Sequence, residues 1–308
     1  MCVYNLSNYR NNPMKRIVIY HRKSEKFECP DGTAAAAVVS LCYPDAVLYG
    51  GMYGQEPPDV SAYRKIVIVD FSYPGSILRK WRETSKVMII DHHKTALNDL
   101  SGLSSKVMKR IDLEESGATL TWKTLFPNRP MPKVLEYVRD QDLWLFNLPQ
   151  SREVNAGISS LKKGRIGIEV VKELMLLNDS KLLTATVDLG VKKIEETQKR
   201  VEAIANEERE VGFQWQGATL RVGVLEIPEE DLDINSGICS LIYRKKPEYQ
   251  FVLGYTSIEG GWAISLRSNR EGSNFDVSMV AKANGGGGHL NASGCVMSTE
   301  RLQEYGVF

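Results

Sequence analysis

Residues 86–93 read Lys-Val-Met-Ile-Ile-Asp-His-His, an apolar run that ends in three side chains able to bind a metal ion. Such a run indicates a buried strand, and open α/β sheets place their active sites at the carboxyl ends of strands. Adjacent side chains of a strand face opposite sides. His92 and His93 can therefore serve one site only if the backbone turns at His92 or just after it. Taken alone, the triplet is equally compatible with a solvated histidine pair.

Two earlier apolar runs predict further strands, over residues 15–21 and 65–70. Helix signals separate the strands: one helix is expected to start after Asp31 and another at Pro74. Strands that alternate with helices at this spacing predict a parallel sheet with right-handed crossovers. We therefore expect the N-terminal half to be a Rossmann-like α/β domain built on a parallel sheet.

The length of 308 residues predicts two domains, because single hydrophobic cores stop growing at about this size. Paired charges around a sparse apolar stripe indicate a long amphipathic helix after residue 182. The expected organisation is a first domain over residues 14–182, a linker helix over 183–210 and a smaller α/β domain over 211–308.

The composition excludes several classes of protein. Hydrophobic residues make up 43% of the chain and charged residues 25%, as in ordinary globular proteins. The formal net charge of +1 provides no basic field for long double-stranded nucleic acid, and no apolar run is long enough to cross a membrane. The scattered cysteines form no Cys-x-x-Cys pair, which predicts a reduced, cytoplasmic protein. The sequence leaves the oligomeric state open, and a homodimer is compatible with it.

Metal-capable side chains gather where predicted strands end and where helices begin or end: His21, Asp31, Asp70, Asp91, His92, His93, Asp140 and Asp142. Mixed carboxylate and imidazole ligands suit manganese, iron or zinc, whereas carboxylates alone suit magnesium. Each residue also has a structural alternative, such as a helix cap for Asp70 or an ion pair with Arg139 for Asp140. Gathered at one edge of a sheet, they predict a site for two divalent ions that bind a phosphoryl group.

In the second domain, strands are predicted over residues 250–255 and 262–267, joined by a hairpin turn. A glycine run then precedes His289, and its backbone N–H groups could bind an anion; a flexible turn is the alternative. The side chains of Ser265 and Arg267 share one face of a strand, and a guanidinium group can bind phosphate through two hydrogen bonds. The candidate substrate-binding residues are Ser265, Arg267, Ser268, Gly286, Gly287, Gly288, His289 and Asn291.

The order and spacing of these motifs resemble the DHH phosphoesterases, which include single-strand exonucleases, nano-RNases, cyclic dinucleotide phosphodiesterases and exopolyphosphatases. The resemblance extends over nearly the whole chain, from about Met14 to about Met297. Its motifs are His21 with Cys29-Pro30-Asp31-Gly32, Val69-Asp70-Phe71-Ser72, Asp91-His92-His93, Arg139-Asp140-Gln141-Asp142-Leu143-Trp144, and Gly286-Gly287-Gly288-His289 followed by Ala292-Ser293-Gly294. The last of these is similar to the family's DHH-associated substrate-binding domain.

The resemblance implies two divalent ions, usually manganese, with zinc, iron or magnesium as alternatives. Asp70 and Asp140 would bridge the ions, and Asp31 and His92 would complete the ligands of one of them. His21 would hold the other ion together with the residue at position 29.

The chain departs from the family pattern in two places. Cys29 stands where the first aspartate of the family's motif usually stands, and a thiolate is a softer ligand that favours zinc or iron. The segment Arg22–Glu28 is also longer than usual, so His21 could be displaced. A further choice lies between Asp140 and Asp142, which are two residues apart at a helix end and cannot point the same way; we favour Asp140.

The activity implied by the resemblance is a metal-dependent phosphodiesterase that cleaves short oligonucleotides or linear dinucleotides to mononucleotides, in a cleft between the two domains. His93 would contact a substrate phosphate, and Asp91 would accept a hydrogen bond from a histidine and so fix its tautomer. Two alternatives remain. One is a phosphomonoesterase or exopolyphosphatase that acts on 3′-phosphonucleotides or polyphosphate, and the other is a non-catalytic nucleotide-binding module.

Overall fold

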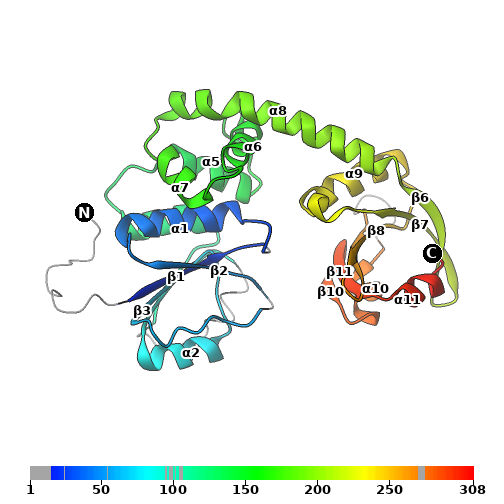
Figure 1. Cartoon of the computed structure of the whole chain (residues 1–308), viewed down its shortest axis with the longest axis horizontal. Helices are drawn as coiled ribbons and strands as arrows, with labels where there is room; N and C mark the ends of the chain where they lie inside the picture. Colours follow the sequence, from blue (N-terminus) through cyan, green and yellow to red (C-terminus); the bar gives the residue numbers. More distant parts are fainter. Residues whose placement is uncertain are drawn as a thin grey trace. The chain divides into compact units, whose positions relative to one another are not determined.

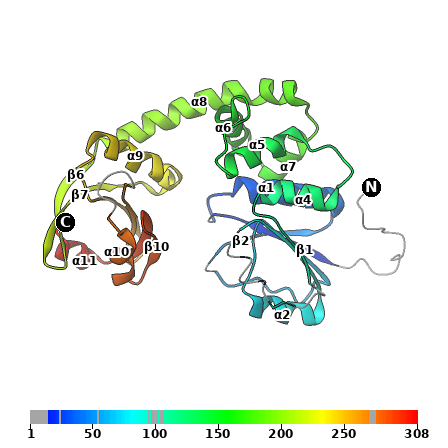
Figure 2. The same cartoon turned by 180° about the vertical axis from the view of Figure 1, so that it is seen from behind.

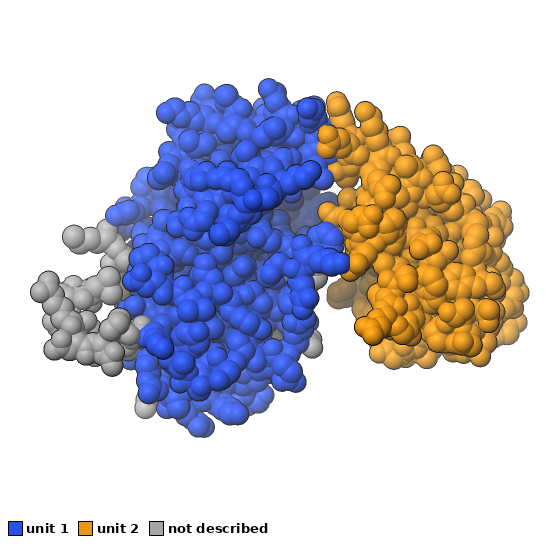
Figure 3. All heavy atoms as spheres, viewed as in Figure 1, with its two compact units in different colours: residues 1–194 blue, residues 195–308 orange. Residues whose placement is uncertain are grey.

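The computed structural model describes residues 15–23, 25–53, 55–93, 96, 100, 102–103, 107–269 and 275–308. The chain divides into two compact units, residues 1–194 and residues 195–308 (Figure 3). Helix α8 (Asp179–Ala205) lies in the region where the sequence predicts a long helix, and the division between the units falls inside it.

The first unit is built on a parallel sheet of five strands in the order β2-β1-β3-β4-β5. Their bounds are β1 Arg16–His21, β2 Val47–Gly51, β3 Lys65–Val69, β4 Lys86–Asp91 and β5 Met108–Ile111. Every pair of neighbouring strands in it is parallel, which confirms the predicted α/β fold class. Because β1, β3 and β4 are neighbours, their carboxyl ends meet at one edge of the sheet.

Helices cover both faces of this sheet (Figures 1 and 2). Their bounds are α1 Pro30–Cys42, α2 Gly75–Thr84, α4 Gly117–Leu125, α5 Lys133–Asp142, α6 Ser151–Leu161 and α7 Gly167–Leu174. Alternate strand residues face opposite sides, so Ile66 and Ile68 of β3 pack in the core beneath α2, whereas Val67 and Val69 pack in the core of α1, α4, α5 and α7. The four alanines 34–37 are fully buried, and their small side chains let α1 pack closely on both the sheet and α4.

The second unit contains a sheet of six strands in the order β10-β11-β9-β8-β7-β6. Its strands are β6 Arg209–Trp215, β7 Ala218–Glu226, β8 Phe251–Ile258, β9 Gly261–Arg267, β10 Gly287–His289 and β11 Ala292–Met297. Its helices are η1 Glu229–Ile234, α9 Asn235–Lys245, α10 Val277–Ala283 and α11 Thr299–Glu304. The predicted hairpin is present, since Ile258 pairs with Gly261 across a turn in which Gly260 has a φ of 83°.

Part of the glycine run is the short strand β10, which pairs with β11. Side chains at Gly286 or Gly288 would collide with the backbone of β11: a Cβ at Gly286 would lie 2.2 Å from Gly294 O, and one at Gly288 would lie 2.6 Å from Ala292 O. Close approach of two backbones is therefore one reason for glycine at these positions.

Among the helices that the structure describes, none combines the length and the apolar character needed to span a bilayer.

Candidate metal centre

Asp70 lies at the centre of the group that forms at the carboxyl edge of the first sheet. It follows β3 directly and has a φ of 54°, so the chain turns sharply there while its N–H donates to Ile90 O of β4 at 3.0 Å. A non-glycine residue with positive φ is uncommon, and such strain tends to occur at functional sites. The turn keeps the Asp70 side chain almost fully buried, with 1% of its surface exposed.

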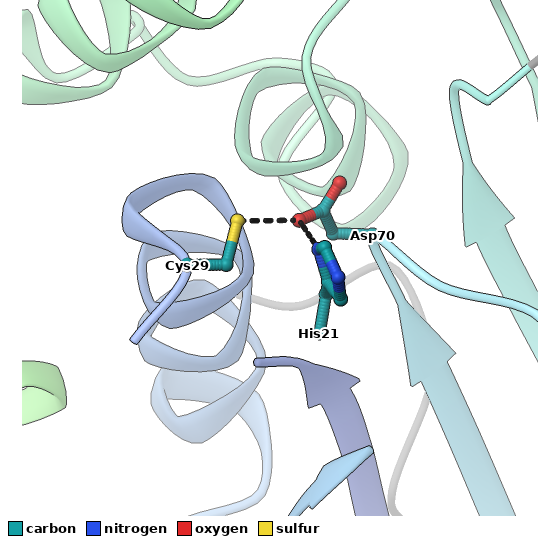
Figure 4. A group of neighbouring side chains, drawn as sticks. All are labelled: His21, Cys29 and Asp70. Atoms are coloured by element: carbon teal, nitrogen blue, oxygen red, sulfur yellow. Dashed lines mark hydrogen bonds and ion pairs between the residues drawn. The ribbon is translucent and has the colours of Figure 1, made fainter. Parts of the chain in front are cut away.

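The two carboxylate oxygens of Asp70 face two different sets of ligands. Its Oδ2 lies 3.4 Å from Cys29 Sγ and 3.6 Å from His21 Nδ1 (Figure 4). Its Oδ1 lies 3.1 Å from His92 Nε2, on the other side of the carboxylate. One carboxylate that faces two ligand sets is the geometry required to bridge a pair of cations.

The second set of ligands surrounds His92, which follows β4. Its Nε2 lies 3.6 Å from Asp31 Oδ2 and 3.5 Å from Asp142 Oδ2. These three side chains offer ligand atoms within 4.8 Å of one another, as do His21, Cys29 and Asp70. These two groups of three draw on β1, β3, β4, α1 and α5, and a third group, Asp70 with His92 and His93, overlaps both of them.

The chemistry of both groups fits divalent cations. Among the described residues, three buried side-chain atoms here have no hydrogen-bond partner: His21 Nδ1, Asp70 Oδ1 and Asp142 Oδ2. Buried polar atoms are nearly always paired, and cations held by the two groups would satisfy all three. Nitrogen, oxygen and sulfur donors of this kind are ligands of manganese, iron and zinc.

The charges of the centre are strongly coupled. Burial raises the pKa of Asp31, and the neighbouring Asp70 and Asp142 carboxylates raise it further. Burial also acts to raise the pKa of Asp70, but contacts with His21 and His92 outweigh it and lower that pKa. Burial acts to lower the pKa of His92, but the hydrogen bond to Asp70 and the charge of Asp31 outweigh it and raise this pKa to about 9. His92 therefore holds a proton in the ion-free chain at neutral pH, where a cation could replace that positive charge.

His93 and Asp91 form a pair beside the ligand groups. Asp91 Oδ1 accepts from the backbone N–H groups of His92 and His93, at 2.8 and 3.1 Å, and contacts His93 Nδ1 at 2.8 Å. These hydrogen bonds hold a turn of the backbone after β4. The sequence predicts such a turn if both histidine rings are to serve one site. The hydrogen bond from Asp91 raises the pKa of His93. A third of the His93 side chain is exposed, so its ring is accessible to a ligand.

Asp31 is positioned by the start of α4. The backbone N–H of Gly117 donates to Asp31 Oδ2 at 2.5 Å, and that of Ala118 donates to Oδ1 at 3.0 Å. A helix N-terminus offers free N–H groups and favours negative charge. The sequence predicts a helix start near Gly117, but not that the N–H groups of this helix start hold Asp31. The available signal was Gly117 itself, a residue without a side chain directly after the helix-capping Ser116.

Replacing Gly117 with alanine is expected to distort the centre. The new Cβ would lie 2.5 Å from Asp70 Cβ and 2.9 Å from Asp31 Oδ2, which is too close for any real contact. We expect a loss of about 1–3 kcal/mol in the free energy of unfolding from overpacking, together with weaker binding of divalent ions by calorimetry. Gly237→Ala in α9 is the matched control, because its Cβ would meet Val201 Cγ2 at an ordinary 3.5 Å. Equal behaviour of the two variants would contradict this role for Gly117.

In the structure Asp142 lies with Asp31 and His92, whereas the sequence favoured Asp140; which of the two binds an ion stays a prediction. Asp140 is buried and accepts from the backbone N–H groups of Asn147 and Leu148, at 2.9 and 3.2 Å. Its carboxylate thus holds the loop after α5. Asp142 points to His92 instead, and burial raises its pKa, with Asp70 adding to the rise and His92 opposing it.

In the second unit, the predicted substrate-binding residues lie on β9, on β10 and in the segments next to these two strands. Strand β11 lies between β10 and β9, and it pairs Ser293 with Gly288 on one side and Leu266 on the other. Two of the predicted side chains already form hydrogen bonds, since Asn235 Nδ2 donates to Ser265 Oγ at 2.5 Å and Arg267 Nη1 donates to the carbonyl of Leu266 at 2.9 Å.

Two more of the predicted residues pair with each other, since Asn291 Nδ2 donates to Ser268 Oγ at 2.8 Å. His289 is exposed at the end of β10. The role of these residues in substrate binding stays a prediction.

Comparison with known proteins supports the fold. No family model matches the chain. An uncharacterized protein of Acanthamoeba polyphaga mimivirus is 26% identical over 308 residues, covering 94% of this chain and 69% of that protein. The DHH domain of a member of a family of ribosomal proteins is similar in structure, with a TM-score of 0.58, 13% identity, and coverage of 95% of this chain and 84% of that one. A pGpG-specific phosphodiesterase from Vibrio cholerae has a TM-score of 0.48 and 14% identity, with coverage of 94% of this chain and 95% of that one.

The chain therefore has a DHH-type fold. This confirms, at the level of the fold, the resemblance that the sequence motifs indicate.

Proposed function

We propose that this protein is a metal-dependent phosphoesterase that uses two divalent ions, with manganese as the first candidate. The observation that carries the proposal is Asp70, whose two carboxylate oxygens face two separate groups of ligand atoms at the carboxyl edge of a parallel sheet. Paired ions of this kind activate water and stabilise the charge that develops on a phosphoryl group. The DHH-type fold supports the same class of reaction.

The residues of the centre divide into ligands and substrate contacts. We assign His21, Cys29, Asp31, His92 and Asp142 as ligands and Asp70 as the bridge. His93 would donate a hydrogen bond to a phosphate oxygen and place a positive charge beside it. Asp91 forms a hydrogen bond with His93 Nδ1 and favours the protonated ring. Asp91 acts through His93 by fixing the orientation and the tautomer of the ring.

The proposed substrates are short oligonucleotides or linear dinucleotides, cleaved to mononucleotides. The net charge of +1 supports a short substrate held by local contacts, because long nucleic acid requires an extended basic surface. The candidate residues of the second unit, among them Arg267 and His289, would bind the terminal phosphate of such a substrate.

The test is the release of labelled mononucleotide from a diribonucleotide in the presence of Mn²⁺, with chelated protein and Asp70→Asn as controls. Release of phosphate from polyphosphate or from a 3′-phosphonucleotide, without cleavage of the diribonucleotide, would replace the proposed substrate with a phosphomonoester or phosphoanhydride. Nucleotide binding without turnover under manganese, zinc and iron would overturn the enzymatic proposal and support a non-catalytic binding module.

A further inference from the structure

We propose that His21, Cys29 and Asp70 form a mixed nitrogen, sulfur and oxygen site that selects a thiophilic divalent ion such as zinc or ferrous iron. The two positions of the centre would then hold chemically different ions. This inference rests on the metal centre of the proposed function and names a property of one half of it.

The first step of the argument is the geometry around the Cys29 sulfur. Cys29 Sγ, His21 Nδ1 and an oxygen of Asp70 lie within 4.8 Å of one another, and Figure 4 shows the three side chains converging. They come from three separate segments: the end of β1, the residue before α1, and the residue after β3. Small rotations of the side chains would bring all three donors to one ion.

The second step is that His21 points to a ligand independently of the cysteine. Its Nδ1 is buried and has no hydrogen-bond partner among the described residues, although it lies 3.6 Å from Asp70 Oδ2. The ring stacks on Phe71, with the ring centroids 5.9 Å apart and the planes at 15°, which fixes its orientation. A buried ring nitrogen that faces a carboxylate at ion-pair distance, without a hydrogen bond, is a donor available to a cation.

The third step is that packing and capping give no sufficient reason for a cysteine at this position. Cys29 is the N-cap of α1, yet its sulfur accepts from Gly32 N only at 3.5 Å, and Ser, Thr, Asp or Asn are the preferred caps. Its sulfur also lies against the Asp70 carboxylate. Cys239, by contrast, packs in an apolar cluster with Ile238 and Ile242, as buried cysteines usually do.

The two ligand groups therefore differ in softness. Asp31, His92 and Asp142 provide oxygen and nitrogen donors without sulfur, a set compatible with manganese. The His21 group adds sulfur, and soft thiolate ligands select zinc and iron. On binding, the thiol loses its proton to solvent and the sulfur forms a bond to the ion, so one proton is released for each ion bound there.

The test is a titration of ion-free full-length protein with Co²⁺ and, separately, with Cd²⁺, followed by ultraviolet absorption. A thiolate bound to either ion gives a sulfur-to-metal charge-transfer band. We expect this band in the wild-type protein and in Cys239→Ser, the matched control for a buried cysteine, and we expect its loss in Cys29→Ser. In Cys29→Asp the band should also be lost, and competition between Zn²⁺ and Mn²⁺ should shift toward Mn²⁺. Circular dichroism establishes that each variant is folded.

Absence of the band in the wild-type protein, or its persistence in folded Cys29→Ser, would overturn the thiolate site. The readout needs no substrate, so it separates this inference from the proposed function. A protein that shows the band but cleaves no phosphate ester keeps the site and loses the function. A protein that cleaves phosphate esters with Mn²⁺ but shows no band keeps the function and loses the site.

Discussion

Replacing Asp70 with asparagine is expected to abolish binding of both divalent ions and to reduce kcat/KM for phosphate ester cleavage by about a thousandfold or more. Asparagine keeps the shape of the side chain but loses the negative charge, and it offers one oxygen where the carboxylate offers two. Both ligand groups depend on those oxygens, because Oδ2 faces His21 and Cys29 while Oδ1 faces His92. Isothermal titration calorimetry gives the number of ions bound, and initial rates on a diribonucleotide give the loss of turnover.

The control for Asp70→Asn is Asp188→Asn, an exposed aspartate on α8 that lies outside both ligand groups. This variant should bind two ions and retain the rate of the wild-type protein. If Asp70→Asn still bound two ions per chain with undiminished turnover, Asp70 would not be the bridge, and the proposed centre would be wrong in its main feature.

The sheet of the first unit was predictable because its strands are buried on both faces. A parallel strand covered by helices on both sides becomes a continuous apolar run, as in Lys65–Val69 and Lys86–Asp91. The spatial order β2-β1-β3-β4-β5 produces no local pattern in the sequence, since it depends on which helices pack on which face of the sheet. His21, Asp70 and the Asp91–His93 triplet could still be identified, because each follows a recognisable apolar run.

The sequence was least informative where a side chain's direction depends on residues distant in sequence. It could not show that the loop after α5 turns its N–H groups back to Asp140. The role of Gly117 depends on Asp31, which is 86 residues earlier in the chain. In the second unit, the sequence did not predict β10, because a three-residue strand is too short to show an apolar pattern.

The pair Asp142→Asn and Asp140→Asn should separate a ligand from a residue that only holds a loop. Asp142→Asn is expected to lose binding of one ion and most of the turnover without lowering the stability of the ion-free protein. The pKa of Asp142 is raised in the folded chain. Its ionised form therefore destabilises the fold above the ordinary carboxyl pKa, so that a neutral amide removes this cost at neutral pH.

Asp140→Asn is expected to show the opposite pattern. The buried carboxylate accepts from the N–H groups of Asn147 and Leu148, and an amide can replace only one of these two oxygen acceptors. The unmatched N–H and NH₂ groups should lower the free energy of unfolding by about 1–3 kcal/mol, while both ions still bind. Urea denaturation of the ion-free proteins measures the first quantity and calorimetry the second. Only a ligand can change the number of ions bound without changing the stability of the ion-free chain. If Asp140→Asn lost an ion at unchanged stability while Asp142→Asn retained both ions, Asp140 would be the ligand, as favoured from the sequence.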